Sequence, residues 1–505
     1  MSRLFALTLL SGLVCPLGAT TLHVGAGHPW ANLEAAAGAA SPGDTILFHG
    51  GTYSGGQYVA NLSGNASAWI TILAAPGEEV IVSGGGTAWQ LSDPSYVAIE
   101  GFTFEQQTLN GVNIDDGGDY ATPAHHVQIR SCRFREINAT GNNDLLKLSG
   151  LDDFEISHCT FADGAEGGSG IDMVGCHRGT IQHNSFARMG SNAIQAKGGT
   201  AEITIARNFF LHCGARTLNL GGSTGLAYFR PLDAPYEASD LLVWANVIVG
   251  SDAPIAYVGS VNVHVVNNTI VRPQIWVTRI LQETVDPTRF LECGDNSFRQ
   301  NLIFQGTIRT ETNVGPNTRP ETFIYADNYW HNYQNPSWSG PALPVPDAGL
   351  VLGPDPQFAD SLSHNYRLKN SSPAIGLIST GGPPLEDFDL TPYAVPRSAG
   401  AFEGNPPSTD VPPESGLPQS VPLLVNYPNP FNASTRIELL LPASGYVSLE
   451  VFALDGTLVA RLLDGVLESG THSLTFHAPM LATGTYILRA RTPSAQATRR
   501  ILLIR

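Results

Sequence analysis

Lysine is the scarcest charged residue of this chain, which makes each lysine a candidate for chemistry. The sequence contains three, Lys147, Lys197 and Lys369, against 24 arginines. Lys197 stands in the segment "QAKGG", after an alanine that the strand pattern predicts to be buried and before two glycines that let a ligand approach closely. A lysine amine can accept a proton in a reaction when its surroundings favour the neutral form. Lys197 is therefore our candidate for a catalytic base.

Polar residues alternate with apolar residues in a series of short segments around Lys197. The segments "GVNIDD", "LLKLSG", "GIDMVG", "AIQAKG" and "TLNLGG" each predict a strand whose apolar residues point inward and whose other residues point outward. When such strands stack about 4.8 Å apart, their outward residues form a polar column. The column contains Asn113, Lys147, Asp172, Gln195 and Asn219, and Lys197 lies two residues along its strand. A line of donors, acceptors and charges is suited to an extended saccharide, whose hydroxyls repeat at comparable intervals.

Two long insertions beside this column carry aromatic rings together with charged side chains. The first follows Asn219 and the second follows Asn268. They supply Tyr228, Arg230, Tyr236, Glu237, Trp276, Arg279, Gln282 and Glu283. Rings offer faces on which sugars stack, and charged or amide groups bind hydroxyls and carboxylates. We predict a carbohydrate cleft whose substrate-binding residues are Lys147, Gln195, Asn219, Arg230 and Arg279.

Two reactions suit such a cleft. In β-elimination from a uronate, a base removes the proton next to the carboxylate while a cation neutralises that carboxylate. Here Lys197 would be the base, and Arg216 or Arg230 the cation. Hydrolysis needs two carboxylates on either side of the glycosidic bond, roughly 5 to 10 Å apart. The candidate pairs combine Asp172 with Asp144, Asp115 or Glu237. A surface carbohydrate-binding or adhesive protein without turnover is the third hypothesis.

A repeat in the middle of the chain predicts how these segments stack. Segments such as "HVQIRSCRF", "DFEISHCTF" and "ITIARNFF" share alternating apolar residues, a small or amide residue at a bend, and a large apolar residue two positions later. The bends recur every 22 to 38 residues, which is typical of a β-solenoid with inserted loops. Asparagine amides stacked at a bend can bind each other and the nearby backbone. The bend residues are Phe102, Cys132, Cys159, Asn184, Asn208, Asn246, Asn268, Asn301 and Asn328.

Both ends of the repeat are consistent with the same fold. Before it, residues 30–40 predict a helix that caps the open end of the solenoid, where an exposed sheet edge would invite aggregation. After it, "RSAGAFEGN" at residues 397–405 is similar to the closing segment of known β-helices. Over residues 20–403 the chain resembles the right-handed parallel β-helix proteins of the pectate-lyase-like superfamily. We therefore expect an all-β chain with a right-handed parallel β-helix over residues 20–405.

Around Lys197 the chain resembles chondroitinase B and the related alginate lyases. Those enzymes carry a base lysine just past a strand, an arginine in the following coil, and calcium held by nearby Asn and Glu residues. The resemblance assigns the base to Lys197. It assigns the arginine to Arg216, three residues before the family's position, where this chain has Asn219. It also implies calcium, for which Asp172 and Glu237 are the predicted carboxylates.

The composition changes after Asn405. Residues 406–422 are rich in proline and serine, which predicts an extended linker. Residues 423–505 alternate strands with turn residues, as a small β-sandwich does. This segment resembles the type A C-terminal sorting domain of type IX secretion substrates, with "YPNPF" from Tyr427, then "ATGTYILR" and a closing "RRILLIR". The resemblance implies export by the type IX secretion machinery; an accessory sandwich that binds cell wall or sugar is the alternative.

Charge and the N-terminus restrict partners and location. Residues 1–19 combine one positive charge, an apolar stretch and small residues, which predicts a secretory signal peptide. A net charge of −17 argues against nucleic acid as a partner, since phosphate binding needs clustered lysine and arginine. We expect a monomer, secreted or at the cell surface, whose partner is an extracellular polysaccharide.

The cysteines and five of the histidines show no metal-binding pattern. After the signal peptide five cysteines remain, without CxxC spacing, which predicts buried thiols instead of a disulfide framework or a zinc site. Histidines occur on different coils without convergent spacing, and we expect loop and surface roles for them. They are His125, His126, His177, His183 and His212.

Overall fold

The computed structural model describes residues 19–379, 384–404, 423–427, 431–441, 444–453, 457–468, 470–478, 481–492 and 496–503. The predicted linker, the predicted signal peptide up to residue 18, and Pro428–Pro430 of the sorting motif lie outside these ranges. The described chain divides into two compact units. One contains residues up to 354 with residues 378–401, and the other contains residues 355–377 with those from 402 onward.

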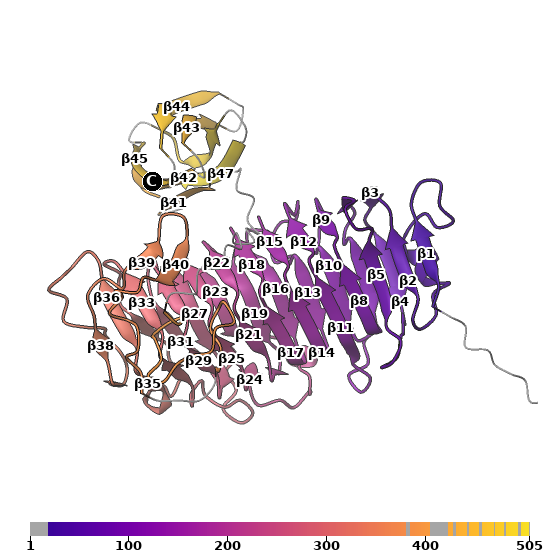
Figure 1. Ribbon diagram of the computed structural model, residues 1–505, viewed down its shortest axis with the longest axis horizontal. Helices are drawn as coiled ribbons and strands as arrows, with labels where there is room; N and C mark the ends of the chain where they lie inside the picture. Colours follow the sequence, from indigo (N-terminus) through magenta and orange to yellow (C-terminus); the bar gives the residue numbers. More distant parts are fainter. Residues whose placement is uncertain are drawn as a thin grey trace, which may run out of the picture. The chain divides into compact units, whose positions relative to one another are not determined.

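The first unit is a solenoid of parallel strands (Figure 1). Within residues 19–354, which the structure describes without a gap, the chain visits three parallel sheets in turn, named here A, B and C. Each strand buries its apolar residues in one shared core, because alternate side chains of a strand point to opposite faces. Parallel strands need crossover connections, and the next sheet of the coil supplies them here.

The strands of the three sheets have the following bounds. Sheet A contains β1 (Thr21–Val24), β2 (Thr45–Phe48), β5 (Ile70–Ala74), β8 (Ser95–Glu100), β11 (Ala124–Arg130), β14 (Leu151–Ser157), β17 (His177–Gln182), β20 (Thr200–Ala201), β21 (Thr204–Ala206), β24 (Ala238–Ser239), β25 (Leu242–Trp244), β28 (Ser260–Val261), β29 (His264–Val266), β32 (Ser297–Arg299), β35 (Ile324–Ala326) and β37 (Asp347–Ala348). Sheet B contains β3 (Gly51–Ser54), β6 (Val80–Ser83), β9 (Thr103–Glu105), β12 (Arg133–Arg135), β15 (Thr160–Ala162), β18 (Ser185–Ala187), β22 (Phe209–Leu211), β26 (Val247–Val249), β30 (Thr269–Val271), β33 (Leu302–Gln305), β36 (Tyr329–Asn332) and β38 (Val351–Leu352). Sheet C contains β4 (Gln57–Ala60), β7 (Trp89–Ser92), β10 (Val112–Asp115), β13 (Leu146–Ser149), β16 (Ser169–Val174), β19 (Asn192–Lys197), β23 (Arg216–Gly221), β27 (Ala253–Val258), β31 (Thr278–Leu281) and β34 (Thr312–Val314).

The predicted bend residues form a ladder between sheets A and B. Each asparagine amide donates to the side-chain oxygen of the next, as Asn208 Nδ2 does to Asn246 Oδ1 at 3.1 Å and Asn246 Nδ2 to Asn268 Oδ1 at 2.9 Å. The same oxygens accept the backbone amide of the preceding coil's asparagine. The ladder is buried and runs through Asn184, Asn208, Asn246, Asn268, Asn301 and Asn328. The predicted structural role of these asparagines is confirmed.

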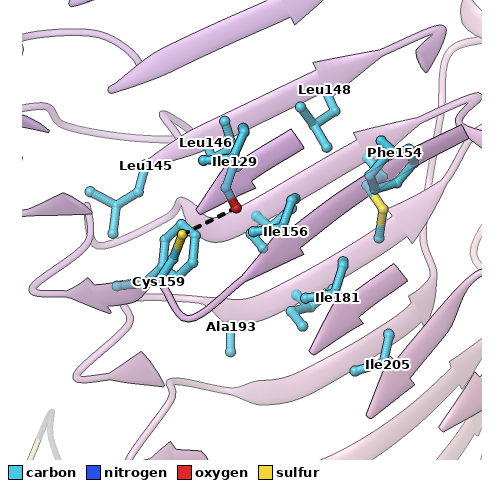
Figure 2. Packing of buried hydrophobic residues seen from close by; sticks show 14 of the residues in the cluster. Ile129, Leu145, Leu146, Leu148, Phe154, Ile156, Cys159, Ile181, Ala193 and Ile205 are labelled. Atoms are coloured by element: carbon cyan, nitrogen blue, oxygen red, sulfur yellow. Dashed lines mark hydrogen bonds between the residues drawn. The ribbon is translucent and has the colours of Figure 1, made fainter. Parts of the chain in front are cut away.

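Identical or similar apolar side chains stack along the core. Ile129, Ile156, Ile181 and Ile205 occupy one register position in successive strands of sheet A, and Figure 2 shows them in one row, with Ile129 beside Leu146 of sheet C. Earlier in the ladder of bends, cysteine replaces asparagine, and the Cys159 thiol donates to the Ile129 carbonyl at 3.5 Å (Figure 2). The cysteines after the predicted signal peptide are buried and free, as expected: Cys132, Cys159, Cys176, Cys213 and Cys293.

The predicted cap helix is shorter than its sequence pattern. Helix α1 covers Leu33–Ala37, where residues 30–40 were expected. Asn32 caps its N-terminus by accepting a hydrogen bond from the Ala35 amide at 2.9 Å. Trp30 bridges to Val24 in a strand-like pairing, so the helix cannot start there. No helix among the described residues is long and apolar enough to cross a membrane.

The segment after residue 384 packs along the solenoid. Arg397 and Ser398 are buried, and the Ser398 carbonyl accepts from Asn267 Nδ2 at 3.2 Å. The Asp387 carbonyl accepts a hydrogen bond from Arg207 Nε at 2.8 Å, two coils earlier. The predicted closing segment, in its part up to residue 401, therefore lies against the bends of several coils and contributes core contacts there.

The second unit contains antiparallel strands. A hairpin joins β39 (Phe358–Asp360) and β40 (Asn365–Leu368). Among residues 423–503, as far as they are described, β41 (Leu423–Tyr427), β42 (Ser434–Leu441) and β45 (Gly470–His477) form one sheet, and β43 (Gly445–Ala453), β44 (Leu458–Leu467), β46 (Gly484–Arg491) and β47 (Gln496–Leu503) form another. The two sheets share one apolar core, which includes Ile437, Val447 and Leu488. This is the small sandwich that the sequence predicts.

Candidate functional site on sheet C

The parallel register of sheet C places the predicted polar residues side by side. Successive pairs join Asn113 to Lys147, Lys147 to Asp172, Asp172 to Gln195, and Gln195 to Asn219. This confirms the alignment of the predicted column, while the roles of its members stay predictions. The same row continues to Gln90 at one end and, past Ala256, to Arg279 and Asn313 at the other.

Two of the three lysines meet at Asp172 in the middle of the column. Lys147 Nζ contacts Asp172 Oδ2 and lies 3.3 Å from Asp144 Oδ2. Lys197 Nζ lies 3.2 Å from Asp172 Oδ1. The two amines approach different oxygens, so one carboxylate holds both in place. We call Asp144, Lys147, Asp172 and Lys197 the lysine–aspartate cluster.

The carboxylates of this cluster are more deeply buried than its amines. The side chains of Asp144 and Asp172 are 1% exposed, against 26% for Lys147 and 11% for Lys197. Burial and repulsion by Asp172 raise the pKa of Asp144 to about 6, although Lys147 opposes part of this shift. Burial lowers the pKa of Lys147, but the attraction of Asp172 and Asp144 outweighs it, so the net shift of that pKa is upward. A ligand on sheet C meets the amines first.

Asp144 reaches the cluster because the strand alternation breaks just before β13. A regular strand places residues three apart on opposite faces. Here Leu145 and Leu146 are both buried, which returns Asp144 to the same side as Lys147. The Ser169 amide donates to Asp144 Oδ1 at 2.8 Å. Asp144 was predicted for hydrolysis alone, and its contact with Lys147 was missed because a spacing of three residues argues against a shared face.

Close packing across two coils holds Lys197 at the end of β19. A Cβ atom on Gly222 would lie 3.2 Å from both Cβ and Cδ of Lys197, and 2.8 Å from Gln195 Nε2. Glycine at position 222 therefore gives the two side chains room. Gly222 follows β23, in the coil after Lys197, and its role was not predicted from the sequence.

Glu237 is buried and connects three loops through hydrogen bonds. Its carboxylate accepts from the Gly198 amide at 2.8 Å, from the Thr224 amide at 2.9 Å and from the Thr224 hydroxyl at 2.7 Å, and also from the Thr284 hydroxyl. Both oxygens are thus bound by the chain itself. Because the Gly198 amide follows Lys197 directly, Glu237 anchors the turn that carries the candidate base.

The predicted calcium ligands do not fit a cation. Calcium takes six to eight oxygen ligands. Each oxygen of Asp172 lies against a lysine amine, and those of Glu237 are bound by amides and hydroxyls, so the chain itself already occupies these oxygens. The two carboxylates are therefore structural and electrostatic groups here, and no step below runs through calcium.

Arg230 does not join the column, contrary to its predicted substrate-binding role. Its guanidinium donates to both oxygens of Asp152, at 2.7 and 2.8 Å, and to the Gly175 carbonyl at 2.9 Å. Arg178 also binds Asp152. Burial raises the pKa of the Asp152 carboxyl, but hydrogen bonds with His177 and Arg230 outweigh burial and hold that pKa well below its usual range. Asp152 lies in β14 of sheet A. Arg230 thus holds the insertion that follows Asn219 against the solenoid.

Two other arginines lie on the face of sheet C. Arg216 donates to Asn219 Oδ1 at 3.2 Å and to Glu283 Oε1 at 2.6 Å. Arg279 stacks on Trp276, with its guanidinium carbon 4.4 Å from the ring centroid. Burial lowers the pKa of Arg279, and the nearby positive charge of Arg216 lowers it further. The two guanidinium groups form a positive flank beside the column.

The insertion after Asn219 contacts another loop and exposes one aromatic ring. The Tyr120 hydroxyl donates to the Ala227 carbonyl at 2.6 Å, which joins two loops that are four coils apart along the column. Tyr228, in the short 3₁₀ helix η1 (Leu226–Tyr228), is 67% exposed and offers a ring for stacking. Tyr236 instead packs on Phe229 and Phe290. Of the two predicted tyrosines, Tyr228 is the one that is available to a ligand.

Two family models match the chain. The model described as right handed beta helix region matches residues 88–270, and that described as secretion system C-terminal sorting domain matches residues 426–504. No curated protein matches the chain. The predicted β-helix and sorting domain are thus confirmed. The sorting domain marks the chain for type IX secretion, so the protein is secreted or at the cell surface.

Solved structures of several enzymes match the chain at low sequence identity. Pectate lyase Pel9A matches with a TM-score of 0.52 and 14% identity, over 77% of this chain and 97% of that chain. An alginate lyase from Paenibacillus sp. str. FPU-7 gives a TM-score of 0.39 and 18% identity, over 59% and 97%. The A-module of mannuronan C-5 epimerase AlgE6 from Azotobacter vinelandii gives 0.40 and 14%, over 64% and 93%. The first likeness supports the right-handed parallel β-helix, and activity must be argued from this chain's own residues.

Proposed function

We propose that the β-helix is a polysaccharide lyase that cleaves a uronate-containing glycan by β-elimination. The observation that carries the proposal is the convergence of Lys147 and Lys197 on Asp172, in a chain with one other lysine. The column gives an extended glycan a line of amide and charged groups. A pectate lyase shares the fold, so the scaffold is compatible with this chemistry.

Lys197 is the base in this proposal. As the neutral amine, it removes the proton from the carbon next to the uronate carboxylate. The electron pair of the broken carbon–hydrogen bond forms a carbon–carbon double bond, and the bond between the neighbouring carbon and the leaving glycosidic oxygen breaks. A proton from solvent completes the new hydroxyl. General base catalysis of this kind contributes about 10² to 10⁴ in rate.

Asp172 stabilises the charge that this step creates. Proton transfer turns the Lys197 amine into an ammonium, and Asp172 Oδ1 lies 3.2 Å from its nitrogen. Because the charge develops during the reaction, the attraction is stronger in the transition state than before it, which is the condition for catalysis. Lys147 contacts the other oxygen and keeps the carboxylate in position.

Arg216 and Arg279 neutralise the substrate carboxylate in this proposal. They lie on the same face as the column, and Arg216 already contacts its member Asn219. An anion between two guanidinium groups relieves their repulsion, and arginine binds carboxylates through two parallel hydrogen bonds. Neutralising the carboxylate makes the neighbouring proton more acidic, so the arginines and Lys197 act on the same carbon centre.

Burial of the carboxylates favours elimination over hydrolysis. A hydrolase needs two carboxyl groups that reach the glycosidic bond from either side. Asp144 and Asp172 are 1% exposed and lie beneath Lys147. Glu237, another predicted partner, is bound by four donors. Asp115, the third, accepts hydrogen bonds from Gln90, Asn113 and the Gly117 amide. A glycan on sheet C would therefore contact amines and guanidinium groups before these carboxylates.

The test uses the purified full chain with a panel of acidic and neutral polysaccharides. Elimination leaves an unsaturated product that absorbs ultraviolet light, whereas both elimination and hydrolysis create reducing ends. We expect absorbance from wild type on a uronate polymer, about 10² to 10⁴ less from Lys197→Ala, and an unchanged signal with EDTA. Lys369→Ala, which removes the remaining, exposed lysine, is the matched control and keeps full activity.

Three results would contradict the proposal. Reducing ends without absorbance would make the protein a hydrolase. Retention on a glycan column without either signal would make it a binding protein. Equal absorbance from wild type and Lys197→Ala would remove Lys197 from the mechanism.

A further inference from the structure

Three histidines meet at the N-terminal end of the solenoid, far along the chain from the lysine–aspartate cluster. His23 lies in β1, His49 directly follows β2, and His28 lies in the loop between β1 and α1. One ring nitrogen from each lies within 4.8 Å of the other two. Among the described residues, this group consists of three histidines and contains no carboxylate. The sequence analysis did not consider these histidines, which are 5 and 21 residues apart.

The backbone brings the three rings together through specific contacts. The parallel pairing of β1 with β2 places His49 beside the end of β1, where its amide donates to the Val24 carbonyl at 3.0 Å. Directly after β1 a turn brings His28 back toward the other two rings, and in this turn the His28 amide donates to the Gly25 carbonyl at 3.0 Å. A Cβ on Gly25 would lie 2.9 Å from the Tyr53 hydroxyl and 3.4 Å from His49 Cβ, so glycine permits this approach. The arrangement is built into the first coils.

The contacts of His49 are those of a metal ligand with an outer carboxylate. Its Nε2 shares a hydrogen bond of 2.9 Å with His23 Nδ1, and a metal ion would replace the proton between these two nitrogens. Its other nitrogen, Nδ1, lies 3.6 Å from Glu78 Oε1. The Gly50 amide donates to Glu78 Oε2 at 2.6 Å and keeps that carboxylate in place. A carboxylate on the second nitrogen orients a metal-binding imidazole and fixes its tautomer.

We propose that His23, His28 and His49 bind one divalent transition metal ion. Imidazole is a ligand for Zn²⁺, Cu²⁺ and Ni²⁺, whereas Ca²⁺ and Mg²⁺ prefer oxygen. Three imidazoles leave a further coordination position for water or another ligand, as in open zinc sites.

Binding requires the rings to turn, because the three ring planes lie within 18° of parallel. His28 and His49 are stacked with 3.9 Å between centroids and 5° between planes, while a metal lies in the plane of each imidazole that binds it. Nitrogens around a tetrahedral zinc are about 3.3 Å apart, which follows from zinc–nitrogen bonds of about 2.0–2.1 Å. His28 is exposed, so its ring can turn toward the other two without disturbing the core. The bound ion then joins β1, its loop and the end of β2, and stabilises the first coil by mass action.

Calorimetric titration of the full chain with Zn²⁺ tests this site, using protein without an affinity tag of histidines and freed of metal beforehand. Wild type binds one equivalent, and His28→Ala and His49→Ala each weaken binding about tenfold or more. Glu78→Gln weakens it about tenfold through the outer contact. His126→Ala is the matched control, since it removes one ring of another close pair, His125 and His126, and leaves Zn²⁺ binding unchanged.

A second measurement guards against variants that fail to fold. Zn²⁺ raises the melting temperature of wild type and of His126→Ala, and not that of His28→Ala, whose exposed side chain makes it the safest substitution. The proposal is overturned if Zn²⁺, Cu²⁺ and Ni²⁺ all fail to bind wild type. It is equally overturned if one equivalent still binds His28→Ala and His49→Ala with wild-type affinity, because the ion then lies elsewhere.

Discussion

Replacing Asp144 with asparagine tests the electrostatics of the lysine–aspartate cluster without any substrate. Burial and Asp172 raise the pKa of Asp144 to about 6 in the folded protein, from 3.8. A group whose pKa is raised by folding adds stability below its unfolded pKa, and this stability is lost as pH rises through the folded pKa. At 1.36 kcal/mol per pKa unit, the ionised carboxylate costs about 3 kcal/mol above pH 6. Asp144→Asn removes this titration and keeps an acceptor for the Ser169 amide.

Thermal unfolding of wild type and Asp144→Asn near pH 4 and near pH 7.5 measures the effect. About 3 kcal/mol corresponds to about 6 °C, if each kcal/mol moves Tm by about 2 °C in a domain of this size. We therefore expect the melting temperature of the variant, relative to wild type, to rise by about 6 °C between the two pH values. Asp119→Asn, on an exposed loop, controls for the loss of one carboxylate.

One result would refute this reasoning directly. If the difference in melting temperature between Asp144→Asn and wild type is the same at both pH values, Asp144 does not titrate between them. If the melting temperature of Asp144→Asn falls relative to wild type as pH rises, ionised Asp144 stabilises the fold through Lys147, and burial is the weaker effect.

Three further predictions concern other parts of the β-helix. Arg230→Ala removes the guanidinium that binds both oxygens of the buried Asp152, and lowers the free energy of unfolding by about 3 kcal/mol in urea denaturation. Activity per folded molecule is kept, and a loss of activity in fully folded protein would show that Arg230 belongs to the site. Asn246→Ala interrupts the asparagine ladder, leaves the Asn208 amides without their acceptor and costs about 2 kcal/mol or more in the same assay, unlike substitution of an exposed asparagine. Arg279→Gln removes one of the two charges that neutralise the uronate carboxylate and lowers kcat/KM about tenfold with a fall in kcat, and an unaltered kcat/KM would exclude it from the positive flank.

The polar column was predictable because it depends on local patterns. Strands alternate with a period of two, and coils of a solenoid repeat in register. Counting from the bend residues therefore aligns Lys147, Asp172 and Gln195 without knowledge of the tertiary structure. The asparagine ladder was predictable for the same reason, since one side-chain type recurs at one position of each coil.

The contacts of the insertions were not predictable in this way. Arg230 lies 78 residues from Asp152, and no period of the chain relates the two positions. Glu237 binds donors from turns 39 residues before it and 47 residues after it. Both residues are charged and lie beside the column in the sequence, which is why they were predicted to be ligands of substrate or calcium. Buried charges need partners, and the loop conformation decides which partners they find.

The sequence by itself determined the β-helix, the order of its coils, the sorting domain and the row of outward residues on sheet C, because each follows from periodic patterns or a contiguous motif. Tertiary structure alone decided which charges meet. It returned Asp144 to the face of Lys147 where two leucines break the alternation, and it brought His23, His28 and His49 together through a turn and a strand pairing. These contacts depend on Coulomb attraction and close approach in space, which the chain's repeat does not encode.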